Sequence, residues 1–153
     1  MIFDIGSLNV NIQEFNNLVP VYEKMLTADL GVNILRSKVA DKLSTQYGMT
    51  VTDADVEAIY RDKYLIINGE KMEESKQIVD QLMANHVKDI FNYAPSRKVS
   101  FSNTEVIFVG GGSLLLKEYL INEYPTAAIS NDAQMSNALS FLTILEAKHH
   151  GQS

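Results

Sequence analysis

Hydrophobic and polar residues alternate at the start of the chain in a pattern that predicts strands. A short apolar run covers residues 2–5, and the alternation over residues 10–15 has the period of a half-buried strand. A third strand is predicted over residues 18–22. Asn16 and Asn17 join it to the second strand in a tight turn, because asparagine tolerates positive φ.

Apolar residues then recur with the spacing of helices. One stripe predicts a helix with Asp29 as its N-cap and Gly48 at its end, and the apolar face is expected to pack into the core. A longer helix is predicted over residues 73–91. Pro95 follows shortly after its end, since proline cannot continue a helix.

The residues between these two helices, about 49–72, are predicted to form a small inserted subdomain. A short helix capped by Thr52 or Asp53 comes first. A strand follows, and Asn68-Gly69 after it is a strong turn signal.

Strand and helix alternate in the last third of the chain. The predicted elements are a strand over 105–109, a glycine turn, a helix over 114–122, a strand over 127–129 and a helix over 133–147. Three consecutive strands extended in this way make a mixed five-stranded sheet with helices on both faces, which is the order of an α/β, ribonuclease-H-like domain. We expect one such domain, with its core in residues 1–48 and 73–148.

Composition narrows the class of protein. Of 153 residues, 46% are hydrophobic and 21% charged, which is ordinary for a soluble globular domain. A net charge of −6 without a basic cluster argues against direct binding of nucleic acid. The sequence has no cysteine, no signal-peptide pattern and no apolar run near the roughly 20 residues that span a bilayer, so we expect a cytoplasmic protein without membrane contact.

Two glycine turns carry the candidate chemistry. Asp4 and Gly6 close the first predicted strand, and glycines 110–112 follow the strand over 105–109. Glycines let a backbone pass close to a ligand, and a helix that begins there offers free N–H groups to phosphate. A carboxylate at the end of a strand is suited to hold a metal ion near such phosphates.

Each turn also has a purely structural interpretation. Asp4 could merely cap a turn, and the glycines could serve only as a sharp connection from strand to helix. The sequence has no P-loop, hydrolase-elbow or zincin motif. His86 lies within a predicted helix and forms no metal cluster with His149 and His150.

The residues at the first turn resemble those of the C-terminal lobe (domain II) of bacterial actin-like ATPases, most of all the ParM/StbA plasmid-segregation group. That superfamily opens the lobe with Asp-x-Gly-(Gly/Ser)-x-Thr-x-Asp, which Asp4, Gly6 and Ser7 match. Asn9 and Asn11 stand where the family has threonine and aspartate. The asparagines can still form hydrogen bonds, but they supply no second carboxylate.

The resemblance extends over nearly the whole chain. The family's adenosine motif, an apolar strand into three glycines and a helix, is matched over residues 106–116 with few departures. Residues 29–33 resemble the segment that opens the helix before the insert, and residues 131–141 resemble the closing helix. The insert itself matches only in layout.

Proteins of this kind hold nucleotide between two lobes, so the resemblance implies ATP or GTP with Mg²⁺. The N-terminal lobe has no counterpart in these 153 residues, and we expect a domain excised from a longer protein, with a natural half-protein as the alternative. The complete protein is expected to be an ATPase. The isolated lobe is expected to bind nucleotide weakly if at all and to be inactive.

The resemblance also implies roles for single residues. Asp4 is the catalytic and metal candidate, because it would hold Mg²⁺ through water or orient the attacking water. The cofactor-binding candidates are Gly6, Ser7, Asn9, Gly31, Glu57, Arg61, Gly110, Gly111, Gly112, Ser113 and Leu114. Glu57 and Arg61 lie four residues apart on one predicted helix, so a surface ion pair between them is the alternative to nucleotide contact.

Three functions stay open at this point. The first is a filament-forming subunit that segregates plasmid DNA through a DNA-binding adaptor protein, with Tyr60, Tyr64 and Met72 as exposed contact candidates. The second is half of a sugar- or acetate-kinase-type enzyme of the same superfamily. The third is a nucleotide-free interaction domain, which the two asparagine departures favour. The closeness of the adenosine segment favours the first.

Overall fold

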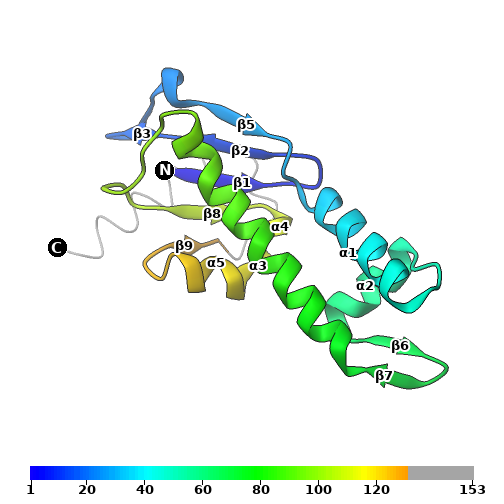
Figure 1. The fold of residues 1–153 in the computed structure, drawn as a ribbon. Coiled ribbons are helices and arrows are strands. Elements are labelled where there is room, and N and C mark those ends of the chain that lie inside the picture. Colours follow the sequence, from blue (N-terminus) through cyan, green and yellow to red (C-terminus); the bar gives the residue numbers. More distant parts are fainter. Residues whose placement is uncertain (131–153) are drawn as a thin grey trace.

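The structure of the chain is a computed structural model that describes residues 1–130. Its centre is a five-stranded sheet in the order β5-β2-β1-β8-β9 (Figure 1). These strands are β1 (Ile2–Ile5), β2 (Val10–Gln13), β5 (Leu26–Ala28), β8 (Ile107–Val109) and β9 (Ala128–Ile129). The β5–β2 and β2–β1 pairs are antiparallel, while β1–β8 and β8–β9 are parallel. The predicted mixed five-stranded sheet is therefore confirmed.

The helices pack beside this sheet, and two small ribbons lie outside it. The helices are α1 (Val32–Tyr47), α2 (Asp53–Asp62), α3 (Glu73–Ser96), α4 (Gly111–Leu115), α5 (Lys117–Glu123) and the 3₁₀ helix η1 (Tyr22–Lys24). The ribbons are β3 (Phe15–Asn16) with β4 (Val19–Pro20), and β6 (Leu65–Ile67) with β7 (Glu70–Met72). No helix among residues 1–130 is long and apolar enough to cross a membrane.

The edge strand beside β2 is not the one that the sequence predicts. Residues 18–22 leave the sheet, and β4 pairs only with β3. A tight turn does form, but one residue later than predicted: Asn17 and Leu18 occupy it at φ 46° and 67°, while Asn16 lies in β3 and pairs with Val19. Pro20 has no N–H with which to extend a ladder. The chain turns through η1, and β5 takes the edge position that residues 18–22 were expected to fill.

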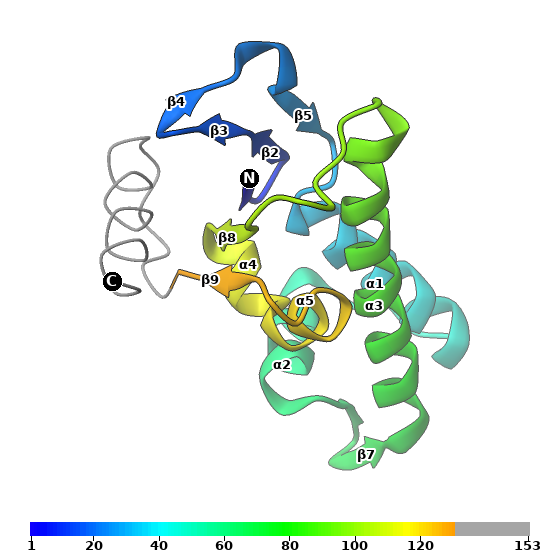
Figure 2. The same cartoon turned by 90° about the vertical axis from the view of Figure 1, so that its left-hand side faces the viewer.

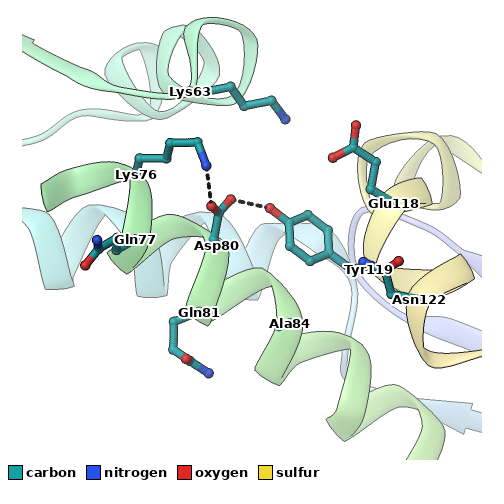
Figure 3. A pocket seen from close by; sticks show the side chains of 9 residues that line it. All are labelled: Lys63, Lys76, Gln77, Asp80, Gln81, Ala84, Glu118, Tyr119 and Asn122. Atoms are coloured by element: carbon teal, nitrogen blue, oxygen red, sulfur yellow. Dashed lines mark hydrogen bonds and ion pairs between the residues drawn. The ribbon is translucent and has the colours of Figure 1, made fainter. Parts of the chain in front are cut away.

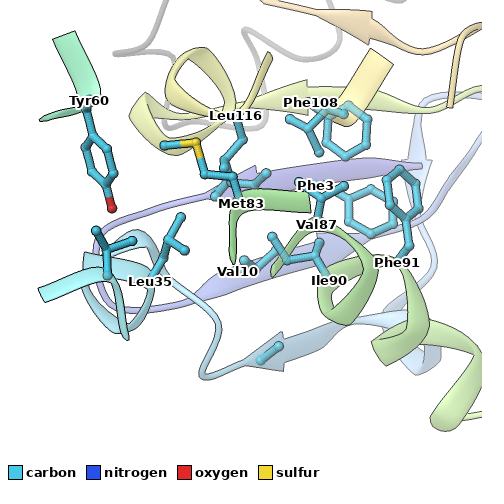
Figure 4. Packing of buried hydrophobic residues seen from close by; sticks show 14 of the residues in the cluster. Phe3, Val10, Leu35, Tyr60, Met83, Val87, Ile90, Phe91, Phe108 and Leu116 are labelled. Atoms are coloured by element: carbon cyan, nitrogen blue, oxygen red, sulfur yellow. The ribbon is translucent and has the colours of Figure 1, made fainter. Parts of the chain in front are cut away.

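The main core lies between the sheet and α1, α3 and α5, which share one side of it (Figures 2 and 4). Successive strand residues point to opposite faces. Phe3 and Phe108 face the helices, whereas Ile2 and Ile107 belong to a smaller cluster on the other face. Phe91 of α3 completes an aromatic group, with ring centroids 6.0 Å from Phe3 and 5.6 Å from Phe108. The predicted helix over 133–147 lies outside the described residues.

The two long helices differ from prediction at one end each. The N-cap of α1 is Gly31 and not Asp29, while Gly48 ends it as expected with φ 62°. Helix α3 runs on to Ser96 and contains Pro95 in its last turn. The buried side chains of Phe91 and Ala94 keep this turn in the core, so packing offsets the one backbone bond that proline removes.

Two elements after β8 replace one predicted helix. Helix α4 begins at Gly111, before the expected start at residue 114, and α5 begins at Lys117. Leu116 separates them with φ −95° and ψ 7°, outside helical geometry. Leu116 itself is fully buried, so the break serves to bring its side chain into the core.

Residues 49–72 lie at the end of α1 and α3 that is remote from the sheet (Figure 1). Thr52 caps α2 in a reciprocal capping box with Asp55, as the sequence indicates. The turn between β6 and β7 forms at Asn68 and Gly69, at φ 50° and 82°, and is also confirmed. The segment thus forms one short helix and one hairpin, and its buried residues belong to the main core: Val51, Val56, Ile59, Tyr60 and Leu65.

Candidate functional site

The carboxyl ends of β1 and β8 lie side by side, because the strands are parallel neighbours with Asp4 opposite Val109. This register brings the two glycine turns together from opposite ends of the sequence. The closest approach is at Gly110, which has φ 86°. A Cβ built there would stand 2.5 Å from Asp4 Oδ1 and 2.6 Å from the carbonyl oxygen of Ile5, so only glycine fits.

The other two glycines of the triplet have opposite surroundings. A Cβ on Gly112 would overlap the Ile5 side chain and stand 2.9 Å from its carbonyl oxygen, so Gly112 packs against β1. Gly111 is exposed, and apart from its chain neighbours and the backbone of α4, no atom of the described residues lies within 4 Å of a Cβ built on it. The amides of Gly111 and Gly112 have no hydrogen-bond acceptor within residues 1–130. Gly111 is therefore where a ligand could approach the backbone.

The turn between β1 and β2, residues 6–9, is here called the hairpin loop. Gly6 N–H donates to the carbonyl of Asn9 at 2.9 Å, which closes the loop. Ser7 and Leu8 at its tip are exposed, and their amides bind no acceptor in the part of the chain that the structure describes. The loop therefore presents free backbone donors next to Asp4.

The first turn of α1 is bonded to the hairpin loop and is not free for a ligand. Its three bonds, here called the amide clamp, run from Gly31 N to Leu8 O at 3.3 Å, from Val32 N to Gly6 O at 3.0 Å and from Asn33 N to Ser7 O at 2.9 Å. A Cβ on Gly31 would overlap the backbone of Ser7 and Leu8. Gly31 thus supports the loop from behind. The residue types of Val32 and Asn33 do not reveal these bonds in the sequence, because both residues act through backbone atoms.

Asp4 stands at the centre of this arrangement as a partly buried carboxylate. Burial raises its pKa above the ordinary 3.8, and no side chain in residues 1–130 pairs with it to offset the loss of water. A nearby cation would relieve that cost. The described residues contain no group of three metal-ligating side chains. The site therefore suits a divalent ion held by one carboxylate, waters and a ligand's own oxygens.

Ser113 and Leu114 follow the glycine triplet and differ in exposure. The Ser113 side chain is fully buried, and its hydroxyl donates to the Gly110 carbonyl at 2.7 Å. It thereby stiffens the turn. Leu114 is 39% exposed and is the apolar side chain of α4 that a ligand could reach.

The structure does not bring Glu57 and Arg61 together, so the ion pair considered between them is wrong. Glu57 pairs instead with Arg36 of α1, and Arg61 binds its neighbour Asp62 with Nε 3.1 Å from Oδ1. Each of the two side chains thus pairs with a different residue, and the two do not pair with each other. Glu57 and Arg61 stay exposed.

Tyr60, predicted to be exposed, is buried at 9% exposure and is wrong as a surface contact candidate. Its ring packs into the core between α1 and α2 (Figure 4), while Tyr64 and Met72 are half-buried. The Tyr60 hydroxyl and Arg36 Nε are buried without a partner among described residues. Burial raises the pKa of Tyr60 to about 12.

A pocket of about 590 Å³ lies between α3, α5 and the end of α2 (Figure 3). Asp80 accepts a hydrogen bond from the Tyr119 hydroxyl at 2.6 Å and pairs with Lys76 at 2.9 Å. The side chains of Lys63 and Glu118 point into the same space. None of the predicted site residues lines this pocket, so it is separate from the meeting point of the two turns.

The sheet with its paired glycine turns defines a lobe of the actin-like fold, and solved structures share it. A non-polymerisable mutant of pCBH ParM matches with a TM-score of 0.72 at 16% identity, over 95% of this chain and 46% of that one. The archaeal actin homologue Ta0583 in complex with ADP matches at 0.60 and 23% identity, over 90% and 46%. A 15-stranded ParM filament from Clostridium botulinum matches at 0.70 and 17% identity, over 94% and 44%.

The sequence itself decides the family. The C-terminal domain model of the archaeal MreB-like actin homologues matches residues 2–122, and the chain belongs to this family. The predicted resemblance to the C-terminal lobe of an actin-like protein is confirmed. Comparison with curated proteins finds no match. The chain spans less than half the length of each solved structure named above.

Proposed function

We propose that this chain is the nucleotide-binding lobe of an actin-like protein that binds ATP or GTP with Mg²⁺ and assembles into filaments. The observation that carries the proposal is the meeting of Asp4 with the glycine triplet beside free amides of Gly111 and the hairpin loop. One wall of a binding site for a magnesium-bound polyphosphate needs three features. These are a carboxylate, free backbone donors and a glycine without a neighbouring side chain above it.

Each predicted residue then takes a place around the nucleotide. Asp4 would hold a metal-bound water or orient the attacking water, and the tip of the hairpin loop would cradle phosphate. Bound Mg²⁺ would neutralise phosphate charge. Gly111 would lie under the nucleotide with Leu114 near the base or ribose, while Gly31 and Ser113 would act by holding the turns in place. Contact with residues 57–61 stays a prediction.

We propose three kinds of partner for this lobe: an N-terminal lobe, further copies in a filament and a DNA-binding adaptor protein. We propose that an N-terminal lobe supplies the other half of the phosphate contacts and that ATP hydrolysis belongs to the two-lobed protein. Filament assembly is supported by the shared fold of the Clostridium botulinum ParM filament. A role in plasmid segregation through a DNA-binding adaptor, in the cytoplasm, rests on the sequence resemblance and on the absence of cysteine.

The test is calorimetric titration of Mg-ATP and, separately, Mg-GTP into this chain and into any longer protein that contains it. Binding is expected to be weak for this chain and stronger by at least about tenfold for a two-lobed form, because closure excludes water from the phosphates. Asp4→Ala and Gly111→Val should each weaken binding. Glu70→Ala, on the remote β6–β7 hairpin, is the matched control and should leave it unchanged.

Two outcomes would contradict the proposed function and favour one of the other two candidate functions. Absence of binding to every form would remove the nucleotide site and leave an actin-like interaction domain, which is the function that Asn9 and Asn11 favour. Binding together with phosphate transfer to a sugar or acetate, and no filaments by electron microscopy, would point to the kinase class. Binding with filaments supports the proposal.

A further inference from the structure

A buried histidine of α3 contacts the chain just before α1. His86 is 1% exposed, and its Nε2 lies 2.9 Å from the carbonyl oxygen of Leu30. Because a carbonyl only accepts, Nε2 carries the hydrogen and Nδ1 is the bare nitrogen. Nδ1 is buried with no partner in residues 1–130. Burial lowers the pKa of His86, which favours the neutral ring, and the bond to the Leu30 carbonyl selects the tautomer.

The Leu30 carbonyl stands directly before the amide clamp. Gly31, the first residue of the clamp, is pressed so closely on the hairpin loop that even a methyl group would overlap it. The clamp and the loop therefore cannot shift independently, because backbone atoms on both sides would collide. Any displacement of the Leu30 carbonyl would be passed to the loop.

We propose that His86 is a positioning residue for the ligand site: by holding the Leu30 carbonyl, it sets the amide clamp and through it the hairpin loop. The inference rests on the proposed function, in which the amides of that loop face phosphate. It extends the site to α3, on which none of the predicted site residues lies. His86 touches no ligand and acts only through backbone atoms.

Packing alone does not account for an imidazole at this position. Apart from Ser75, the other buried residues of α3 are apolar: Val79, Met83, Val87, Ile90, Phe91 and Ala94. A leucine at position 86 would fill similar space without burying a bare nitrogen, which is a cost that the single bond to Leu30 only partly offsets. His86 therefore lowers the stability of the fold while it makes one directed bond to the backbone. Such a residue is expected to fix the position of the backbone group that it binds.

The first test is amide hydrogen exchange by NMR on this chain, with His86→Leu and His86→Gln. In His86→Leu the amides of residues 31–33 should exchange about five- to tenfold faster, while those of α2 and of the β6–β7 hairpin keep their rates. The glutamine amide can reach the Leu30 carbonyl, so His86→Gln should restore slow exchange. The ring ¹⁵N spectrum of the unmodified chain should show the Nε2–H tautomer.

Three results would overturn the proposal: unchanged exchange of the clamp in His86→Leu, equal acceleration throughout the chain, or an Nδ1–H tautomer. A parallel titration with Mg-ATP separates it from the proposed function. Weaker binding by about tenfold in His86→Leu, recovered in His86→Gln, is expected. If neither this chain nor a two-lobed form binds nucleotide, the proposed function fails, and the exchange data still decide whether His86 positions the loop.

Discussion

Helix α1 holds two neighbouring segments by different means. At its N-terminus, three backbone amides hold the hairpin loop, and Gly31 leaves no room between them. Further along, α2 rests on α1 mainly through side chains, with Ile59 in the core and the pair of Arg36 with Glu57 near the surface. Backbone bonds in a close-fitting turn allow one arrangement, whereas side chains can slide and find new partners. We therefore expect the hairpin loop to be the rigid part of the site and α2 the adjustable part.

The largest expected effect comes from breaking the rigid part with Gly31→Ala. A methyl group there would overlap the backbone of the hairpin loop, which has no flexible side chain to yield. We expect a loss of about 4 kcal/mol or more in the free energy of unfolding, measured by urea denaturation. Gly111→Ala, in open space, is the matched control and should change stability by less than about 0.5 kcal/mol.

Equal urea midpoints for Gly31→Ala and Gly111→Ala would contradict the comparison, because the clamp would then have room to move. The pair also separates folding from binding. Gly111→Ala should fold normally and yet bind Mg-ATP less tightly, since its methyl group would occupy the surface that the ligand approaches.

The parts of the fold that were predicted correctly depend on short-range signals. These signals each lie within a few adjacent residues whose backbone conformation is specific: the strand over residues 2–5, the glycine triplet, the Gly48 cap and the hairpin turn at Asn68. The mixed five-stranded sheet then followed from the order of elements. Such features do not depend on contacts with residues that are distant in the sequence.

The parts that were missed depend on distant contacts. Strand β5 has only three residues, too few to show a period, and it is placed by pairing with β2, where Thr27 donates to Asn11 at 2.9 Å. The partner of Glu57 lies on another helix, and His86 contacts Leu30 from a different element. No local pattern could show these contacts, because they exist only once the helices have packed.

The second prediction concerns the carboxylate on β1 next to the hairpin loop and uses Asp4→Asn. Burial raises the pKa of Asp4, so the folded protein holds that proton more tightly than the unfolded chain. Stability should therefore fall as pH rises from the unfolded value of 3.8 through the folded pKa, and remain lower at neutral pH. Asparagine carries no such charge and should raise stability at pH 7 by up to about 1 kcal/mol, since the carboxylate is only partly buried.

Thermal unfolding of the unmodified chain and of the Asp4→Asn variant, at pH values from acid to neutral and without nucleotide, measures this difference. The gain from the substitution should disappear near the acid end, where aspartate is also neutral. A variant that is less stable than the unmodified chain at neutral pH would show that the carboxylate has a stabilising partner.

The third prediction concerns the adjustable part and uses Tyr60→Phe. The Tyr60 hydroxyl is buried without a partner among the described residues, and its loss leaves the packed ring in place. We expect unchanged stability or a gain of up to about 1 kcal/mol by urea denaturation. A loss above that size would mean that the hydroxyl is held, for example by a buried water, and that α2 is fixed more firmly than the comparison implies.

The smallest expected effect is the coupling between Arg36 and Glu57, measured by a double-mutant cycle with Arg36→Gln and Glu57→Gln. The Glu57 side chain is 57% exposed, so water screens the pair and the coupling energy should be below about 1 kcal/mol. Such a weak tie would let the side chains of Arg36 and Glu57 change partners while α2 keeps its buried contacts. A coupling energy above about 2 kcal/mol would make α2 as firmly held as the hairpin loop and would abolish the distinction between the two segments.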